Sequence, residues 1–293
     1  MKKTLKPKFI LFLLSIFLIL SCNDDITVQD KGIVNTNNLN VSLHNSNDTI
    51  SQTNAPWLDF YSIADYENAI NLLNQNERYL SDFENDLQFN SMRIALTEDD
   101  REEIGIEDDI LAALLNPEGI IQIGRYIFKI DINDSLVVAF DELNLKDTLH
   151  FSIDDNAIDI LYPATSVIIQ QQRYTNPYKT EKIFRTSDGT VQCKVVYQRA
   201  AIYFSLLTKI CKLHNNGPIH IHFSMMQGSY TQNRNNATTI RFNSYGDGGY
   251  KKSYSFRPYS AMIGLKQFFL STDFYYTDNN NLTSEGVRLT IQK

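Results

Sequence analysis

The sequence has 293 residues, a formal net charge of −7, 43% hydrophobic residues and 12% aromatic residues. This is the composition of an ordinary globular protein, and a net-acidic chain is poorly suited to binding nucleic acid. Residues 22–162 hold 28 acids against 7 Lys and Arg, whereas residues 163–293 hold 6 acids against 16, an asymmetry that predicts two modules.

The first 22 residues have the pattern of a secretory signal. Four lysines lie within the first eight residues, and residues 9–20 form an apolar run interrupted only by Ser15. Such a run is too short to cross a bilayer as a helix but suits the core of a signal peptide. It ends in Ile19-Leu20-Ser21-Cys22, which resembles the bacterial lipobox. The resemblance implies that residues 1–21 are removed and that Cys22 carries a lipid anchor; the alternative is an uncleaved membrane anchor.

The segment that follows predicts the location of the protein in the cell and a flexible tether. Asn23-Asp24-Asp25 resembles the acidic export signal of surface lipoproteins in Bacteroidota; the alternative is that these aspartates only begin a polar linker in a periplasm-facing protein. Residues 22–55 are rich in Asn, Asp, Ser and Thr, and their apolar residues are too scattered to bury a core. We therefore expect an outer-membrane lipoprotein, held at the cell surface by the lipid on Cys22 and a flexible tether.

Residues 56–162 predict a small acidic module of helices and a hairpin. Ser62-Ile63-Ala64-Asp65 is a capping-box pattern. The apolar residues that follow at helical spacing are Tyr66, Ala69, Ile70 and Leu73. Further along, residues 119–140 contain two apolar runs around Asn133-Asp134, which indicates a β-hairpin.

Two runs of acids in this module, residues 99–103 and 107–109, resemble metal or catalytic sites at first sight. The second run comes directly before an apolar segment, residues 110–115, which Asn116-Pro117 ends. Because negative charge is favoured at the N-terminus of a helix, we interpret these acids as structural rather than as ligands.

Residues 163–293 predict a basic, aromatic-rich module of strands. Strand-like patterns recur over residues 191–213, 219–226, 238–245, 251–257, 265–276 and 287–292. Within the first of these the apolar parity switches near Arg199, which indicates a bulge, a bend or a turn. Short antiparallel strands joined by turns indicate a β-sandwich. The expected fold class is therefore α+β, with an acidic helical and hairpin module followed by an antiparallel sandwich-like module.

Three stretches resemble segments of an uncharacterised family of Bacteroidota surface lipoproteins: NPEGIIQIGRYIFKID, VVYQRAAIYFSL and SFRPYS. The likeness covers residues 58–293. It implies an α+β first part and a β-rich second part, and it assigns no functional residues.

A search for catalytic motifs finds no P-loop, GxSxG, HExxH or strand–GxGxxG–helix pattern, so we expect a protein without a cofactor that is not an enzyme. His220 and His222 form an HxH pair on one face of a strand. With His214 or a carboxylate as third ligand, the pair would suit an exported metal-dependent hydrolase; a polar strand face explains the same pattern. Cys193 and Cys211 are expected as buried free thiols unless the chain turns between them and allows a disulfide.

Residues 245–250, Tyr-Gly-Asp-Gly-Gly-Tyr, predict a hairpin loop. That hairpin would place Arg241 and Arg257 on one outer face, with Lys251 and Lys252 at the turn. Guanidinium groups recognise carboxylate and sulfate, so we expect a binding or interaction module for an anionic glycan or for a host or envelope protein. Two other interpretations remain, namely a solvated face whose charge balances the acidic module, and a structural envelope component.

Overall fold

The computed structural model describes residues 39–44, 55–163, 181–213, 219–277 and 284–293. All of them belong to one unit, which spans residues 36–293. The expected signal peptide and Cys22 lie outside the described residues. Among the residues that are described, no helix is long and apolar enough to cross a membrane.

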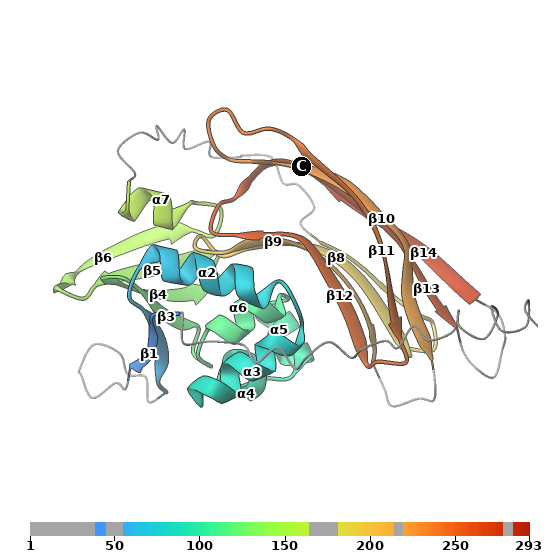
Figure 1. Ribbon diagram of the computed structural model, residues 1–293, viewed down its shortest axis with the longest axis horizontal. Coiled ribbons are helices and arrows are strands. Elements are labelled where there is room, and N and C mark those ends of the chain that lie inside the picture. Colours follow the sequence, from blue (N-terminus) through green and yellow to red (C-terminus); the bar gives the residue numbers. More distant parts are fainter. Residues whose placement is uncertain (1–38, 45–54, 164–180, 214–218, 278–283) are drawn as a thin grey trace, which may run out of the picture. The chain divides into compact units, whose positions relative to one another are not determined.

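A six-stranded sheet forms the first part of this unit (Figure 1). Its strands are β1 (Val41–His44), β2 (Trp57–Phe60), β3 (Ile120–Ile123), β4 (Tyr126–Asp131), β5 (Leu136–Asp141) and β6 (Asn144–Ser152). They lie in chain order, with β2 and β3 parallel and the other neighbours antiparallel. β4 and β5 form the hairpin that was expected around Asn133-Asp134. The sequence did not predict β1, which lies within the expected tether.

Helices pack against one face of this sheet and build a shared apolar core with it. They are α2 (Ile63–Leu73), α3 (Arg78–Leu87), α4 (Met92–Ala95), α5 (Glu98–Glu103) and α6 (Asp109–Leu114); α7 (Ala157–Leu161) follows β6. The predicted start of α2 is confirmed, because the Ser62 side chain accepts a hydrogen bond from the backbone N–H of Asp65. The predicted apolar face of α2 is buried as well.

The structural interpretation of the second acidic run is confirmed at Asp108. Its carboxylate caps α6 by accepting a hydrogen bond from the backbone N–H of Ile110 at 2.8 Å. All the apolar residues of this short helix, Ile110 to Leu114, are buried. The acids therefore begin a helix that is part of the core.

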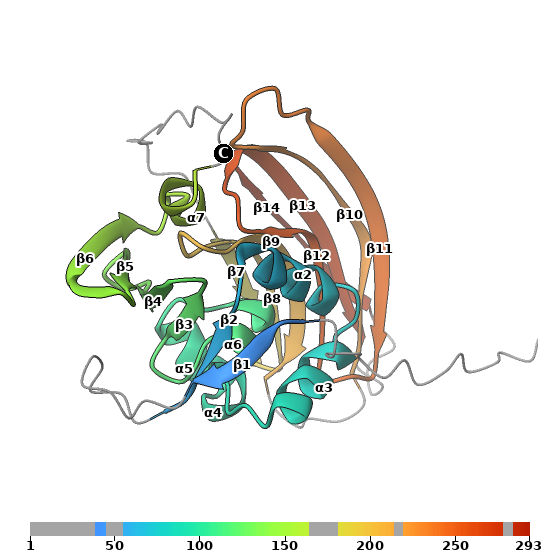
Figure 2. The ribbon, with the colours of Figure 1, turned by 60° about the vertical axis from the view of Figure 1, so that its left-hand side comes forward.

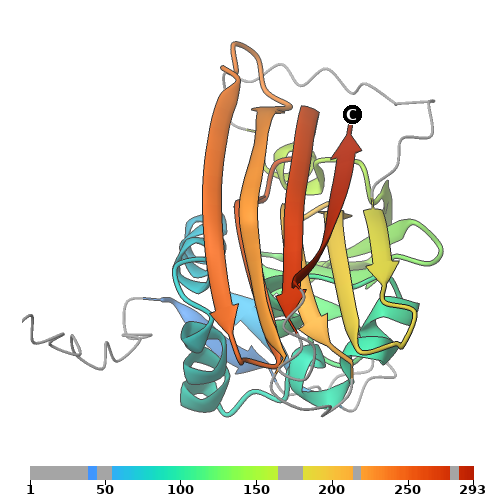
Figure 3. The ribbon, with the colours of Figure 1, turned by 90° about the vertical axis from the view of Figure 1, so that its right-hand side faces the viewer.

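Two four-stranded sheets, in the orders β11-β10-β13-β14 and β12-β9-β8-β7, pack face to face (Figure 3). Their strands are β7 (Glu181–Arg185), β8 (Val191–Arg199), β9 (Phe204–Lys212), β10 (His220–Gln232), β11 (Ile240–Gly249), β12 (Ser253–Ala261), β13 (Leu265–Thr277) and β14 (Ser284–Gln292). Apolar side chains from both sheets fill the space between them. The expected α+β class with a sandwich-like second part is confirmed.

The parity switch near Arg199 is a turn between β8 and β9. These strands pair antiparallel, with Arg199 opposite Phe204, and Ala201 in the turn has a φ of 56°. The residues of the turn, 200–203, are fully buried in the core of the helical part rather than in the sandwich. The hairpin therefore ties the two parts of the unit together.

The two cysteines of this hairpin are free and buried. Cys193 lies opposite Ile210 and Cys211 lies opposite Gln192, so the two thiols point to opposite faces of the sheet. Because a disulfide needs both side chains on one side, the turn between the strands does not bring these thiols together. The expected free thiols are confirmed.

The sheet β12-β9-β8-β7 separates an apolar layer from a polar one. On β9, Phe204, Leu206 and Ile210 point into the sandwich core. The alternating residues Ser205 and Lys209 point the other way and bond to acids of the helical part. Figure 2 shows α2 and α6 on this second side, and α2 is in contact with β12. Both faces of this sheet are therefore covered.

Candidate binding cleft

The polar face of β12-β9-β8-β7 and the helices against it enclose a cluster of charged side chains. We define this buried charge cluster by its members: Glu98, Arg101, Glu102, Glu107, Asp108, Asp109, Lys194, Lys209 and Arg257. The cations on the sheet, Lys194, Lys209 and Arg257, have side chains that are 0%, 3% and 5% exposed. The acids all come from α5, α6 and the connection between them.

Arg257 is fixed in this cluster by Asp108. Its Nε donates to Oδ1 of Asp108 at 2.8 Å, and its Nη2 lies 3.8 Å from Oδ2 of Asp109. Burial by itself lowers the pKa of Arg257, but the two carboxylates outweigh burial and raise that pKa above its ordinary value. Arg257 is therefore a permanent cation whose charge is neutralised inside the protein.

The lysines of the cluster are paired in the same way. Lys209 Nζ lies 2.8 Å from Oε1 of Glu98 and 3.3 Å from Oδ2 of Asp109, and Lys194 contacts Glu107. Burial raises the pKa of Asp109, but Lys209, Arg101 and Arg257 outweigh it and hold that pKa well below its ordinary value. Burial raises the pKa of Glu107 more than Lys194 lowers it. The basic half thus finds part of its counter-charge in the acidic half.

The prediction that Arg257 lies on an exposed outer face is wrong. Strand parity correctly turns its side chain away from the sandwich core, but Asp108 and Asp109 at the start of α6 cover that side. Asp108, which pairs with it, lies 149 residues earlier in the chain, so no local pattern around Arg257 indicates the partner. Arg257 contributes to the cleft described below only from beneath its surface.

The structure places the other predicted residues apart from Arg257. Arg241 is exposed on β11, opposite Ser229, and so belongs to the other sheet of the sandwich. Lys251 and Lys252 are exposed in the connection between β11 and β12. Because the two sheets pack face to face, their outer faces point in opposite directions. Arg241 and Arg257 therefore do not form one face.

The predicted hairpin loop at residues 245–250 is also wrong. β11 continues through this stretch to Gly249, and the chain turns after it. A Cβ added to Gly246 or Gly248 would lie 2.4 Å or 2.5 Å from atoms of Tyr254. These glycines are thus explained by the close approach of the Tyr254 ring to the strand, not by a turn.

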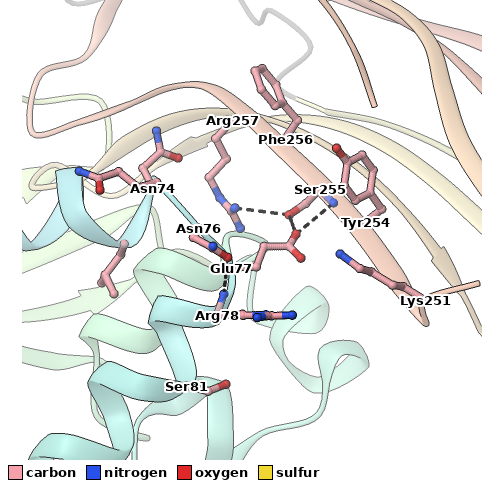
Figure 4. A pocket seen from close by; sticks show the side chains of 12 residues that line it. Asn74, Asn76, Glu77, Arg78, Ser81, Lys251, Tyr254, Ser255, Phe256 and Arg257 are labelled. Carbon is pink, nitrogen blue, oxygen red and sulfur yellow. Dashed lines mark hydrogen bonds between the residues drawn. The ribbon is translucent and has the colours of Figure 1, made fainter. Parts of the chain in front are cut away.

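An open cleft lies where the connection between α2 and α3 faces the edge strand β12 (Figure 4). Its volume is about 630 Å³. The lining residues are Leu73, Asn74, Gln75, Asn76, Glu77, Arg78, Ser81, Lys251, Tyr254, Ser255, Phe256 and Arg257. Of the predicted site residues, the cleft brings together Lys251 and the buried Arg257; Arg241 and Lys252 are not part of it.

Polar side chains on the helical side of the cleft are exposed. Asn74 ends α2, and the amides of Gln75 and Asn76 and the guanidinium of Arg78 follow. Asn76 accepts a hydrogen bond from the backbone N–H of Arg78 at 3.0 Å, which holds the connection in a tight turn. On the strand side, the rings of Tyr254 and Phe256 point toward the sandwich core, away from Glu77 (Figure 4). Hydrogen bonding and charge, rather than ring stacking, dominate this surface.

The floor of the cleft contains a chain of hydrogen bonds (Figure 4). Arg257 Nη1 donates to the hydroxyl of Ser255 at 3.3 Å, and this hydroxyl donates to Oε1 of Glu77 at 2.8 Å. The backbone N–H of Ser255 donates to the same oxygen at 3.3 Å. Because β12 is an edge strand, this N–H points out of the sheet and is available to a partner other than a strand.

Sequence reasoning missed the helical side of the cleft. The run Asn74-Gln75-Asn76 has the pattern of an ordinary helix end followed by a solvated turn. Its position opposite β12 depends on tertiary packing between the two halves of the chain. The one available signal was the concentration of amides next to Arg78.

The HxH pair is where strand alternation predicts, on the outer face of β10. The ring centroids of His220 and His222 are 5.5 Å apart, and His220 Nε2 lies 3.2 Å from Oδ1 of Asp247. The His222 ring stacks on Tyr275, and burial, together with neighbouring His220, lowers its pKa. Within the described part of the chain, no three His, Cys, Asp or Glu side chains are grouped so that they could hold a metal ion. His214 lies outside that part.

Comparisons with known proteins add little to this geometry. No protein-family model and no curated protein matches the chain. The crystal structure of a DUF4848 family protein from Bacteroides thetaiotaomicron is similar over 85% of this chain and 100% of that chain, at 10% identity and a TM-score of 0.21. A likeness this weak carries no argument, so function has to be inferred from the chain's own residues.

Proposed function

We propose that this chain is a lipid-anchored binding protein of the outer membrane, exposed at the cell surface, and that the cleft between the α2–α3 connection and β12 binds an anionic glycan. The lipobox-like sequence before Cys22 and the acids after it support the proposed location at the outer membrane. The composition of the cleft supports the ligand class. The protein acts by holding its ligand, not by transforming it.

The observation that carries this proposal is the grouping of three amides with two exposed cations in one cavity. Amide side chains both donate and accept, which matches the neighbouring hydroxyl groups of a sugar. Arg78 and Lys251 supply positive charge for an acidic substituent, and both are exposed. The volume of about 630 Å³ lies within the range of roughly 300–1,000 Å³ that is typical of small-ligand sites.

The buried charge cluster limits the part of the surface on which an anion can bind. Because Arg257, Lys194 and Lys209 are neutralised internally, they do not attract ligands over a broad surface. This is the charge balance that was one alternative interpretation of the basic half. Recognition of an anion then depends on the few cations that remain exposed near a cavity, and in this cleft these are Arg78 and Lys251.

Titration of the lipidated protein in detergent micelles with acidic oligosaccharides tests the proposal. The panel contains sialyllactose, oligogalacturonate and heparin fragments, with maltotriose as the neutral control. We expect binding of at least one acidic member, and the double variant Arg78→Ala with Lys251→Ala should lose about tenfold in affinity, which corresponds to about 1.4 kcal/mol.

The matched control replaces two exposed cations of the other sheet, Arg241→Ala with Lys266→Ala, and should bind as the wild type does. Equal losses in both double variants would show a diffuse charge effect. Binding of no acidic oligosaccharide at low salt would end the glycan proposal and favour a protein partner.

The proposed lipid anchor and surface location are tested separately. Cys22→Ala should release the protein from membranes or leave it unprocessed, and Asp24→Ala with Asp25→Ala should abolish protease accessibility on intact cells while lipidation persists. Fractionation of Cys22→Ala with lipid after a high-salt wash would contradict the lipid anchor.

A further inference from the structure

The donors at the floor of the cleft are already bound to a carboxylate, and it belongs to the chain itself. Glu77 Oε1 accepts from both the hydroxyl and the backbone N–H of Ser255, at 2.8 Å and 3.3 Å. Figure 4 shows the Glu77 side chain lying across the cleft between the α2–α3 connection and β12. The same two groups could donate to an oxygen of any carboxylate that replaced Glu77.

Arg257 makes the Ser255 hydroxyl a better donor to an anion. It donates to the oxygen of the Ser255 hydroxyl and thereby polarises the O–H that points at Glu77. Its side chain is 5% exposed, and its Nη2 lies 3.8 Å from Oδ2 of Asp109, so only Nη1 is directed to Ser255. The Ser255 hydroxyl therefore presents a polarised O–H to a carboxylate in the cleft, while Asp108 and Asp109 balance the charge of Arg257 from beneath.

The fold does not require the Glu77 carboxylate at this position. Glu77 is the N-cap residue of α3, yet its side chain makes no capping hydrogen bond. The residue is exposed, and exposed contacts of this kind contribute little to stability. The carboxylate can therefore leave the cleft without disturbing the helix that follows.

We propose that Glu77 occupies the carboxylate subsite of the cleft and is displaced by the ligand, which is a saccharide carrying a carboxylate group, such as a uronate or a sialate. This inference rests on the proposed glycan-binding function and specifies its acidic substituent. The hydroxyl and backbone N–H of Ser255 hold the ligand carboxylate, and Arg257 orients that hydroxyl from beneath. Arg78 and Lys251 supply positive charge around the carboxylate, and the amides hold the rest of the sugar. Glu77 lowers the affinity because it competes for the same donors.

Removal of the internal carboxylate tests this directly. Glu77→Ala should bind oligogalacturonate about tenfold more tightly than the wild type, as expected if Glu77 fills the subsite about nine-tenths of the time. Affinity for the methyl ester of the same oligosaccharide, which lacks the charge, should not change. Glu67→Ala, which removes an exposed acid from α2, is the matched control for net charge and should bind as the wild type does.

Three results would overturn the inference: no gain for Glu77→Ala, an equal gain for Glu67→Ala, or a gain that survives in Glu77→Ala with Ser255→Ala. A gain for heparin fragments but not for oligogalacturonate would assign the subsite to sulfate instead.

A second experiment separates this inference from the function on which it rests. Sodium acetate should raise the melting temperature of Glu77→Ala more than sodium chloride does at equal ionic strength, and should not do so for the wild type. Acetate stabilisation without binding of any oligosaccharide supports the subsite and ends the glycan proposal. Oligosaccharide binding by the wild type, with no acetate effect and no gain in Glu77→Ala, supports the glycan proposal and ends the inference.

Discussion

Two of the contacts between the acidic half and the basic half of the chain, the buried charge cluster and the cleft, use their charges differently. In the buried charge cluster, Arg257 and Lys209 are paired with acids and shielded from water. In the cleft, Arg78 and Lys251 face solvent, and the other polar groups of the lining include uncharged amides and the exposed carboxylate of Glu77. The same complementarity between the halves therefore yields a structural contact in one place and a candidate site in the other.

Burial decides between these outcomes. Desolvation makes an ion pair costly to form but very costly to break, since loss of one partner leaves an unpaired charge inside the protein. Exposed charges cost little to hold and little to remove, and they remain available to a ligand. Variants of the two regions should therefore separate stability from binding.

The largest effect should come from Asp108→Asn. Asparagine still caps α6 but leaves Arg257 without its closest carboxylate, so the free energy of unfolding should fall by about 3–5 kcal/mol. Urea denaturation measures this. Asp99→Asn, an exposed acid of α5, should change the free energy by less than about 0.5 kcal/mol. Similar losses in both variants would contradict the distinction between buried and exposed acids.

A smaller loss of stability should follow from lowering the pH. The folded pKa of Asp109 is held below its unfolded value of about 3.9, so its contribution to stability is present above that pH and is lost as the pH falls below about 4. The raised pKa of Glu107 has the opposite sign, since it favours the folded state when this group is protonated. Asp109→Asn should flatten the acid side of the stability profile measured by urea denaturation between pH 6 and pH 3. A profile parallel to that of the wild type would rule out Asp109 as a source of acid sensitivity.

The smallest effect on stability should come from the exposed cations. Arg241→Glu, and the double variant Arg78→Ala with Lys251→Ala, should each change the free energy of unfolding by at most about 0.5 kcal/mol. Thermal and urea denaturation check this alongside the binding assay. A loss of several kcal/mol in the double variant would mean that the cleft is a structural contact like the buried charge cluster.

The features that were predicted correctly from the sequence depend on residues that are close together in the chain. The cap at Ser62, the buried face of α2 and the hairpin around Asn133-Asp134 each follow from residues a few positions apart. One interpretation of the division of charge was a solvated basic face that balances the acidic part; the pairing of Asp108 with Arg257 is such a balance, but it is buried.

The cleft and the cluster could not be predicted in this way. Strand parity turns Arg257 away from the sandwich core, but whether water or helices lie on that side depends on contacts across the chain. The glycines at 246 and 248 gave a turn signal, although they serve the approach of the Tyr254 ring. Glu77 and Ser255 are 178 positions apart, so no local sequence pattern around either residue predicts their contact.

Hydrogen exchange in the presence and absence of oligogalacturonate tests the central claim most directly, because it reports on both regions in one sample. We predict slower exchange at residues 74–78 and 251–257, which line the cleft, and no change at residues 98–109, which belong to the buried charge cluster and its surroundings. Protection confined to residues 240–247 on the other sheet, or to residues 98–109, would contradict the assignment of the cleft as the binding site.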